Sequence, residues 1–408
     1  MGRPKKLIVK KLFSDSEIKL REGTWIEESD IKYPVLESNT DVYWLDDEGQ
    51  EHLLLKFRKN KIKDKLLKLG WDSYKDLAKA SRGRGASAGP VDSETPYWKK
   101  RNLVKTNKWS TGYLNPKGNA LKELYDPMDL LEIQTLAQEF DISYVKEGVD
   151  EDKDQDKDED EDDDKDSLIL ELIKRQGGIS KMKVNNQVAS NPIGFYEESK
   201  NFADLPCRLT HFTRTNFEKY NEGMPFIQRI DSLFKDLTPE AHALQLLRAD
   251  TKPHLKIPGT AFSTVTINRN FRTALHRDAG DFREGFGNLT VIERGAYHGG
   301  YTVFPQFGVG LNLRSGDFVA MDVHQWHSNT PLYETEEDKE HNASLLTSSG
   351  DPDFKDNPEV GTAGLYQSYT RISFVCYLRE KIAKCPDVVD PRYLTKSGHN
   401  KIEPEPEI

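Results

Sequence analysis

The sequence predicts an α+β protein with a mainly β core of the sandwich or jelly-roll kind, preceded by a basic N-terminal region with helices. From about residue 181 onward, short apolar segments alternate with Gly, Pro and Asn, a spacing typical of such β folds. Before that point the chain is rich in Lys, Arg and helix-forming residues. A length of 408 residues allows either two or three domains or one large β domain with insertions.

The first predicted domain, residues 1–148, is marked by its charge. Residues 56–117 hold 17 Lys and Arg against 5 Asp and Glu, a net charge of +12. Such charge asymmetry indicates a nucleic-acid partner. Arg82 and Arg84 lie among small residues in a predicted loop, where they could contact phosphates of a substrate. A flexible surface linker is an equal alternative for this loop.

Two helices are expected in this N-terminal region. Residues 62–69 alternate apolar and Lys residues at helical spacing, and Gly70 is a plausible end of that helix. Residues 121–140 are mostly helix-forming, with a break at Pro127.

An acidic run forms the predicted boundary of the β domain. Residues 150–166 hold 13 acids and 3 lysines, a net charge of −10, which leaves 55 charges of each sign elsewhere. Because this run has no apolar residue to bury, we expect residues 149–167 to be a disordered, solvated loop.

The predicted core domain spans residues 168–385, and residues 386–408 form a tail. Its one clear helix is expected at residues 239–247. Eight segments have the composition of strands. They are residues 184–196, 207–213, 260–268, 287–293, 301–304, 309–313, 317–323 and 371–379.

The cysteines and the apolar residues bear on the compartment. Cys207, Cys376 and Cys385 are widely separated and form no C-x-x-C pair, so neither a disulfide scaffold nor a zinc finger is supported. The chain has no apolar stretch approaching about 18 residues and no signal-peptide pattern. We therefore expect an unsecreted protein of the nucleus or cytoplasm, without a membrane partner.

A group of candidate metal ligands follows one of the predicted strands. His276 and Asp278 are two residues apart, which places both side chains on one face of an extended segment. A further histidine, His327, ends a Gly-Asp-led apolar strand 51 residues later. Two histidines and one carboxylate can hold a non-haem Fe(II) and leave positions open, although zinc is a competing ion.

A predicted strand near the C-terminus carries a second candidate site. Its alternation places Arg371 and Ser373 on one face and apolar residues on the other. An arginine that points into a β core needs an anion, and a dicarboxylate co-substrate would bind it through two hydrogen bonds. The alternative is an exposed edge arginine, or one paired with a structural acid.

These motifs together resemble the Fe(II)/2-oxoglutarate-dependent dioxygenases. The superfamily signature of H-x-D, a distal His and R-x-S is found at residues 276–278, 327 and 371–373. The pattern T-x-N-x-N-x-x-T-x-x-H-x-D-x-x-D at residues 266–281 resembles the TET/JBP group in particular. The resemblance covers roughly residues 180–380.

The resemblance implies a double-stranded β-helix, cupin-like in form, that binds Fe(II) and 2-oxoglutarate. The implied iron ligands are His276, Asp278 and His327, which is chosen over His324 because Ser-Asn-Thr-Pro follows it. Arg371 and Ser373 would bind 2-oxoglutarate.

The implied reaction is oxidation of the 5-methyl group of 5-methylcytosine or thymine in DNA, on a base flipped out of the duplex. Asn268 is a candidate co-substrate ligand, and Asp281 and Asn270 are candidate substrate contacts, with ordinary strand-end and turn roles as the alternative. Residues 328–370 form an insertion that is either a lid or a tolerated loop.

Three other functions remain open. The same iron site could modify 5-methylcytosine with ascorbate in place of 2-oxoglutarate. The substrate could be a protein side chain or a small molecule. A DNA-binding scaffold without catalysis is the alternative from another class of protein.

Overall fold

The computed structural model divides the chain into two compact units. The larger unit comprises Met1–Ser81, Ala86–Gly89 and Gln187–Ile408, and the smaller comprises Arg82–Gly85 and Pro90–Asn186. The structure describes residues 3–77, 80–81, 84–91, 102–107, 110–142, 157–180, 183–184, 188–198, 205–349, 367–390 and 393–394.

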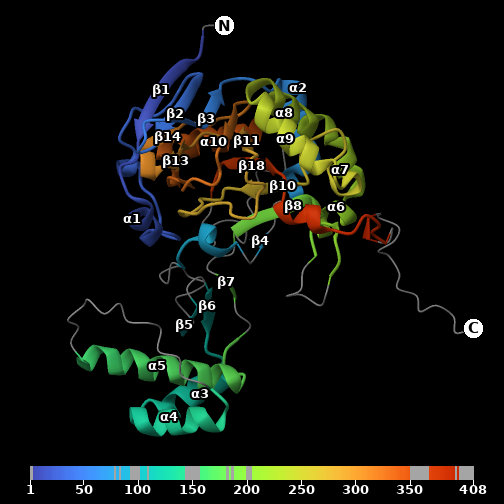
Figure 1. The fold of residues 1–408 in the computed structure, drawn as a ribbon. Helices are drawn as coiled ribbons and strands as arrows, with labels where there is room; N and C mark the ends of the chain where they lie inside the picture. Colours follow the sequence, from blue (N-terminus) through green and yellow to red (C-terminus); the bar gives the residue numbers. More distant parts are fainter. Residues whose placement is uncertain are drawn as a thin grey trace, which may run out of the picture. The chain divides into compact units, whose positions relative to one another are not determined.

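A ten-stranded sheet forms the centre of the larger unit (Figure 1). In spatial order its strands are β1 (Lys5–Lys10), β2 (Thr40–Leu45), β3 (Glu51–Arg58), β15 (Phe318–Met321), β11 (Gly287–Arg294), β18 (Thr370–Tyr377), β10 (Thr264–Arg269), β8 (Val188–Tyr196) and β4 (Ala80–Ser81). The tenth strand, β9 (Arg208–Leu209), pairs with β8. The protein is thus α+β with a large central sheet, as predicted.

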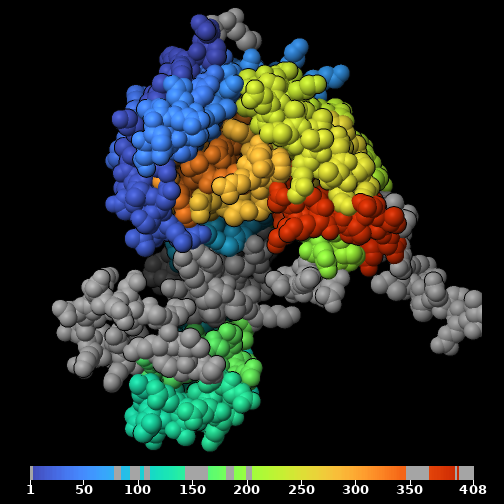
Figure 2. Space-filling model, in the orientation of Figure 1, coloured from blue at the N-terminus to red at the C-terminus, as the bar shows by residue number. Residues whose placement is uncertain are grey.

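The first three strands belong to this sheet, which differs from the predicted separate region of residues 1–148. β3 pairs antiparallel with β15, and it carries the buried side chains of Leu55 and Phe57 into the same apolar core as Val319. Figure 2 shows the N-terminal segment (blue) and the α8–α9 segment (yellow) on either side of later segments of the chain (orange). The apolar run at residues 53–57, whose pattern fits a short strand or the start of a helix, forms part of β3, with Lys56 half-buried between Leu55 and Phe57.

Helices cover one face of the sheet. They are α2 (Asp64–Tyr74), α6 (His211–Thr215), α7 (Phe217–Glu222), α8 (Met224–Leu237) and α9 (Pro239–Ala249). Ile372 and Phe374 of β18 pack in one apolar core with Phe226 and Ile230 of α8. The predicted helix at residues 239–247 is α9, whereas α8 was not predicted, and residues 207–213 form only a two-residue strand before α6.

The predicted end of the first helix at Gly70 is wrong, because α2 continues to Tyr74. A Cβ atom at Gly70 would lie 2.9 Å from the ring of Phe226. Gly70 therefore permits close packing of α2 against α8 instead of ending the helix.

The opposite face of the sheet packs against smaller sheets. One contains β14 (Val309–Leu311), β13 (Thr302–Phe304) and β16 (Ser328–Asn329), and the other contains β12 (His298–Gly299) and β17 (Leu332–Tyr333). Val291 and Val319 of the large sheet share a second apolar core with Phe304, Val309 and Leu311. The other elements are α1 (Asp15–Leu20), η1 (Glu28–Asp30), η2 (Lys75–Leu77), η3 (Gly85–Ala88), η4 (Pro253–Leu255), η5 (Pro305–Phe307), α10 (Glu336–Ser349) and η8 (Glu380–Lys384).

The smaller unit has its own apolar core. It contains β5 (Leu103–Asn107), β6 (Ser110–Tyr113), β7 (Lys183–Val184), α3 (Pro116–Tyr125), α4 (Leu130–Glu139) and α5 (Lys157–Arg175). Leu114, Tyr125, Ile133 and Leu172 are buried together there. The predicted interruption at Pro127 is confirmed, since α3 ends at Tyr125 and α4 begins at Leu130.

The predicted disordered loop at residues 149–167 is wrong from Lys157 onward, because α5 begins there; residues 149–156 lie outside the described residues. The C-terminal part of α5 buries Leu168, Ile169 and Leu172. Acidic residues are favourable near the N-terminus of a helix, where its dipole is positive, so the acidic run can extend a helix that is anchored further along.

The cysteine expectation is also wrong, since a disulfide bond joins Cys207 to Cys385. The two cysteines are 178 residues apart, and they meet in a small apolar cluster with Leu209, Ile382 and Val389. Spacing along the chain could not indicate this pairing.

Within the described part of the chain, no helix has both the length and the apolar character needed to cross a membrane.

Candidate metal and co-substrate site

His276, Asp278 and His327 meet in the larger unit, although 51 residues separate the two histidines. His276 and Asp278 follow β10, and His327 directly precedes β16. The backbones of His276 and His327 exchange two hydrogen bonds, of 3.1 and 3.0 Å, which bring their ring centroids to 4.4 Å. Ligand atoms of all three side chains lie within 4.8 Å of one another.

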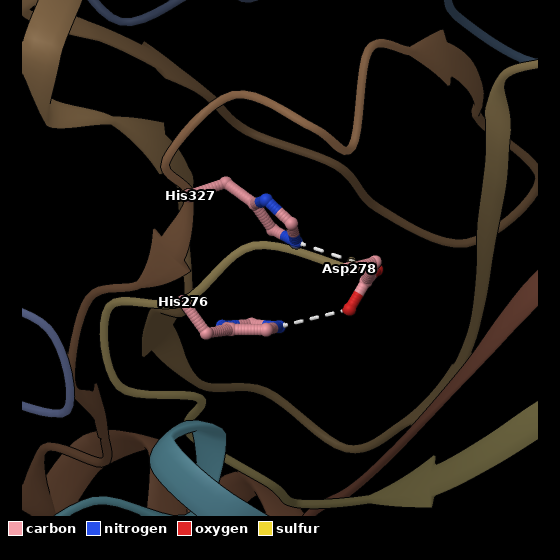
Figure 3. Close-up of side chains that lie close together, drawn as sticks. All are labelled: His276, Asp278 and His327. Atoms are coloured by element: carbon pink, nitrogen blue, oxygen red, sulfur yellow. Dashed lines mark ion pairs between the residues drawn. The ribbon is translucent and has the colours of Figure 1, made fainter. Parts of the chain in front are cut away.

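The hydrogen bonds of both imidazoles leave Nε2 available as a ligand. Nδ1 of His276 donates to the carbonyl of Ala274 at 2.8 Å, and Nδ1 of His327 donates to the carbonyl of Gln325 at 2.9 Å. The two Nε2 atoms lie 3.6 and 3.7 Å from the oxygens of Asp278, as Figure 3 shows. A hydrogen bond from Nδ1 keeps the proton on that nitrogen, so Nε2 is left unprotonated and can bind a metal.

Burial supports the neutral form of one imidazole. Burial, together with the smaller effect of the neighbouring His276, lowers the pKa of His327 to about 4. A neutral imidazole is the form that binds a metal. Two Nε2 atoms and a carboxylate that converge in this way fit a divalent transition-metal ion with open coordination positions.

The other nearby histidines point elsewhere. Nε2 of His324 donates to the carbonyl of Phe282 at 3.3 Å. His298 stacks on Tyr333 and pairs with Asp338, with half of its side chain exposed. Neither belongs to the cluster of convergent ligand atoms, which contains His276, Asp278 and His327.

Arg371 lies on β18 as a buried cation with free donors. Arg371 is 3% exposed, and the Nε and Nη2 atoms of its guanidinium have no hydrogen-bond partner among the described residues. Glu293 of β11 lies opposite Arg371 in the sheet, but Tyr297, Arg314 and the Ser315 N–H already contact its carboxylate. Because a buried, unpaired guanidinium is costly, the site fits an anionic ligand with two acceptor oxygens.

Ser373 and Asn268 lie on neighbouring strands of the same sheet. The two residues are partners in the register of β10 and β18, and the Asn268 amide donates to the Ser373 hydroxyl at 3.3 Å. On its other side, Asn268 accepts a hydrogen bond from Ser190 of β8 at 2.5 Å. Asn268 therefore connects three strands and orients Ser373.

Asn270 holds the start of β18. Its side-chain oxygen accepts the backbone N–H of Arg371 at 2.6 Å, and its amide donates to the Tyr369 carbonyl at 3.0 Å and to Gln367 at 2.8 Å. Its backbone has a φ of 46°, in the left-handed region that Asn tolerates better than most residues. Asn270, a candidate substrate contact, thus uses both the oxygen and the nitrogen of its side-chain amide in hydrogen bonds to the segment that leads to Arg371.

Asp281 lies three residues after Asp278, and its Oδ2 atom is buried without a partner within the described residues. Burial raises the pKa of the Asp281 carboxyl well above its usual value, and the negative charge of Asp278 adds to this. The backbone of Asp281 pairs with that of Arg379, whose guanidinium is held by Glu197.

The structure does not place Arg82 or Arg84, the two predicted phosphate contacts, at this site. Arg82 lies outside the described residues, and Arg84 belongs to the smaller unit. Tyr369, two residues before Arg371, was not among the predicted site residues. Its place on the same alternating segment could have indicated that its side chain lies on the same face as that of Arg371.

Two histidines and a carboxylate form a candidate metal site with the residue types found in non-haem Fe(II) oxygenases, and a buried arginine with free donors belongs to the same unit. Residues 191–380 match the Tet_JBP family model, described as the oxygenase domain of the 2OGFeDO superfamily. The predicted resemblance to the TET/JBP group is therefore confirmed for this part of the chain.

Curated relatives are also similar to part of this chain. "Bifunctional helicase and thymine dioxygenase JBP2" of Leishmania major is 33% identical over 187 residues, which are 46% of this chain and 14% of that protein. "Thymine dioxygenase JBP1-A" of Trypanosoma cruzi is 36% identical over 137 residues, 34% of this chain and 16% of that protein. The chain thus spans only about one seventh of the length of these relatives.

A solved structure titled "NgTET1 in complex with 5mC DNA" aligns over 92% of this chain and 94% of that chain. Its sequence identity is 8% and its TM-score is 0.38.

Proposed function

We propose that this protein is an Fe(II)- and 2-oxoglutarate-dependent dioxygenase that oxidises the 5-methyl group of thymine or 5-methylcytosine in DNA. The observation that carries the proposal is the convergence of His276, Asp278 and His327 in a domain that matches the Tet_JBP oxygenase model. The large sheet and the small β13–β14–β16 sheet would form the two halves of a double-stranded β-helix around this site.

Each residue has a distinct part in this function. Nε2 of His276, Nε2 of His327 and the carboxylate of Asp278 would hold Fe(II), while their Nδ1 hydrogen bonds keep the two rings in position. The bound metal and co-substrate would supply hydroxylation of a C–H bond by O2, in which one oxygen atom enters the substrate and the other enters succinate as 2-oxoglutarate loses CO2. Arg371 would bind the far carboxylate of 2-oxoglutarate, with Ser373 as a neutral donor oriented by Asn268.

The free donors of Arg371 favour 2-oxoglutarate over ascorbate as the co-substrate. A guanidinium that is 3% exposed requires a full negative charge beside it. A carboxylate matches the fork of the guanidinium through two parallel hydrogen bonds.

DNA is the proposed substrate because the relatives carry the name thymine dioxygenase and residues 56–117 of this chain carry a net charge of +12. A target base in a duplex would have to be flipped out to reach a buried metal. The partner-free oxygen of Asp281 is the proposed contact to that base, and a nuclear location would suit the substrate.

The test is succinate release by the purified chain with Fe(II), O2 and 2-oxoglutarate, with and without DNA that contains thymine or 5-methylcytosine. Mass spectrometry of the digested nucleosides identifies the oxidised base. We expect DNA-stimulated succinate and an oxidised base, with both products lost in His276→Ala. Succinate without a modified base would move the substrate to a protein or small molecule, and ascorbate dependence without succinate would replace the co-substrate.

Salt provides an independent test of the DNA contact. Contacts to phosphates release counterions, so affinity should fall steeply between about 50 and 200 mM salt. Activity on DNA that does not change over this range would count against phosphate contacts from the basic region.

A further inference from the structure

We propose that the hydroxyl group of Tyr369 is a further ligand of the carboxylate that Arg371 binds. This inference rests on the proposed function, because it takes 2-oxoglutarate as the co-substrate. It assigns a specific residue to the far end of that molecule. The observations that carry it are the burial of the hydroxyl, the fixed position of its ring and the lack of another acceptor.

The hydroxyl of Tyr369 is buried and has no partner. The residue is 2% exposed, and its Oη atom forms no hydrogen bond to any described residue. Buried tyrosine hydroxyls usually have a partner, because leaving a donor unsatisfied costs about 1–3 kcal/mol. Tyr369 and Arg371 therefore present three unpaired polar atoms, namely one hydroxyl and two guanidinium nitrogens, within one three-residue segment.

Both the ring and the backbone of Tyr369 are held in place. It stacks on Tyr297 with ring centroids 4.7 Å apart. Its own carbonyl accepts a hydrogen bond from Asn270, the residue that also binds the Arg371 N–H. The Asn270 side chain thus fixes the backbone of Tyr369 and of Arg371, the two residues proposed to bind the carboxylate. Because these donors are already held in position, they lose little entropy when the ligand binds.

The preceding residue is anchored by the insertion at residues 328–370. The Ser368 N–H donates to Glu334 at 3.1 Å, and the Ser368 hydroxyl accepts from Asn342 of α10 at 2.9 Å. Asn342 is fully buried and also bonds both backbone groups of Ala296. The described ends of the insertion therefore act as a support for the segment that carries Tyr369 and Arg371.

Two described carboxylates adjoin this segment, Glu334 through Ser368 and Glu293 through its pairing with Arg371, and both are already engaged. Glu334 accepts hydrogen bonds from the N–H and hydroxyl of Ser368. Glu293 accepts from the Tyr297 hydroxyl and the Ser315 N–H. The described residues supply no acceptor for the Tyr369 hydroxyl, and a ligand carboxylate can accept from the guanidinium and from this hydroxyl at the same time.

The experiment is a calorimetric titration of the full chain loaded with Mn(II), an ion that accepts similar ligands without turnover. The ligands are 2-oxoglutarate and 2-oxopentanoate, which has a methyl group in place of the far carboxylate. We expect Tyr369→Phe to weaken 2-oxoglutarate about tenfold and to leave 2-oxopentanoate unchanged. Tyr333→Phe, which removes an exposed hydroxyl, is the matched control and should bind both ligands as the wild type does.

The outcomes separate the possible failures. Wild-type binding of 2-oxoglutarate by Tyr369→Phe would overturn the inference and leave the proposed function intact. Equal weakening of both ligands would assign Tyr369 a structural role and also overturn the inference. If the wild type binds no 2-oxoglutarate while it still binds Mn(II), the proposed co-substrate itself fails, and this inference fails with it.

Discussion

Replacement of Asn270 by Ala should test whether this side chain positions Arg371. The change removes the acceptor of the buried Arg371 N–H and the donor to the Tyr369 carbonyl, which lie at 2.6 and 3.0 Å. An unsatisfied buried backbone N–H costs about 1–3 kcal/mol, and the lost bond to the carbonyl costs about 1 kcal/mol. A left-handed φ of 46° adds about 1 kcal/mol for alanine. The sum predicts that the free energy of unfolding falls by about 3–5 kcal/mol.

The assay is denaturant unfolding followed by tryptophan fluorescence, with Asn270→Gly as the matched variant. Glycine also lacks the amide but adopts a positive φ without strain, so it should be about 1 kcal/mol more stable than the alanine variant. Hydrogen exchange should also become faster at the Arg371 amide in both variants. A loss below about 1 kcal/mol in Asn270→Ala, with an unchanged exchange rate at Arg371, would refute the positioning role.

Three further predictions concern the metal, the disulfide and an ion pair. Asp278→Ala should weaken Mn(II) binding at least about 100-fold in calorimetry, because only two ligands remain; an unchanged affinity would exclude the cluster as the metal site. Cys207→Ser and Cys385→Ser should each lower the free energy of unfolding by about 2–5 kcal/mol, and the double variant should lose no more than either single one, whereas additive losses would contradict the bond. Burial acts to raise the pKa of Glu197, but the hydrogen bonds and charge of Arg379 outweigh this and lower it. The pair therefore stabilises the protein above the unfolded pKa near 4.5, and this contribution is lost as the pH falls below it. Glu197→Gln should flatten acid unfolding in that range, and an unchanged pH profile would contradict the contribution.

The convergence of His276, Asp278 and His327 was predictable because the chemistry of a metal site restricts its candidate ligands. Few residue types bind Fe(II), and the two-residue spacing of His276 and Asp278 is local in the sequence. The choice of His327 over His324 needed the residues that follow it, and the structure supplies the reason in the paired backbones of His276 and His327. Most predicted strands of the core are present for a similarly local reason, since alternation and turn residues are visible in a single segment.

Features that depend on distant segments were not predictable in this way. The place of β3 beside β15 joins residues more than 250 positions apart, so the apolar run of β3 could suggest a strand but not its neighbour in the sheet. The pairing of Cys207 with Cys385 has the same origin. In contrast, the apolar residues of α8 recur at helical spacing, so this helix could have been predicted from its sequence.

The role of Arg371 shows why a site residue can be recognised from the sequence while its state cannot. An alternating strand places the guanidinium on the inner face, but the sequence alone left open whether a structural acid neutralises it. The acid that could do so is Glu293, its partner in the register of β11 and β18. Tyr297 and Ser315 bind that carboxylate from the following loops, so the guanidinium keeps two free donors. Replacing Tyr297 by Phe would free an acceptor of Glu293 for Arg371, and binding of a dicarboxylate would then compete with an internal ion pair.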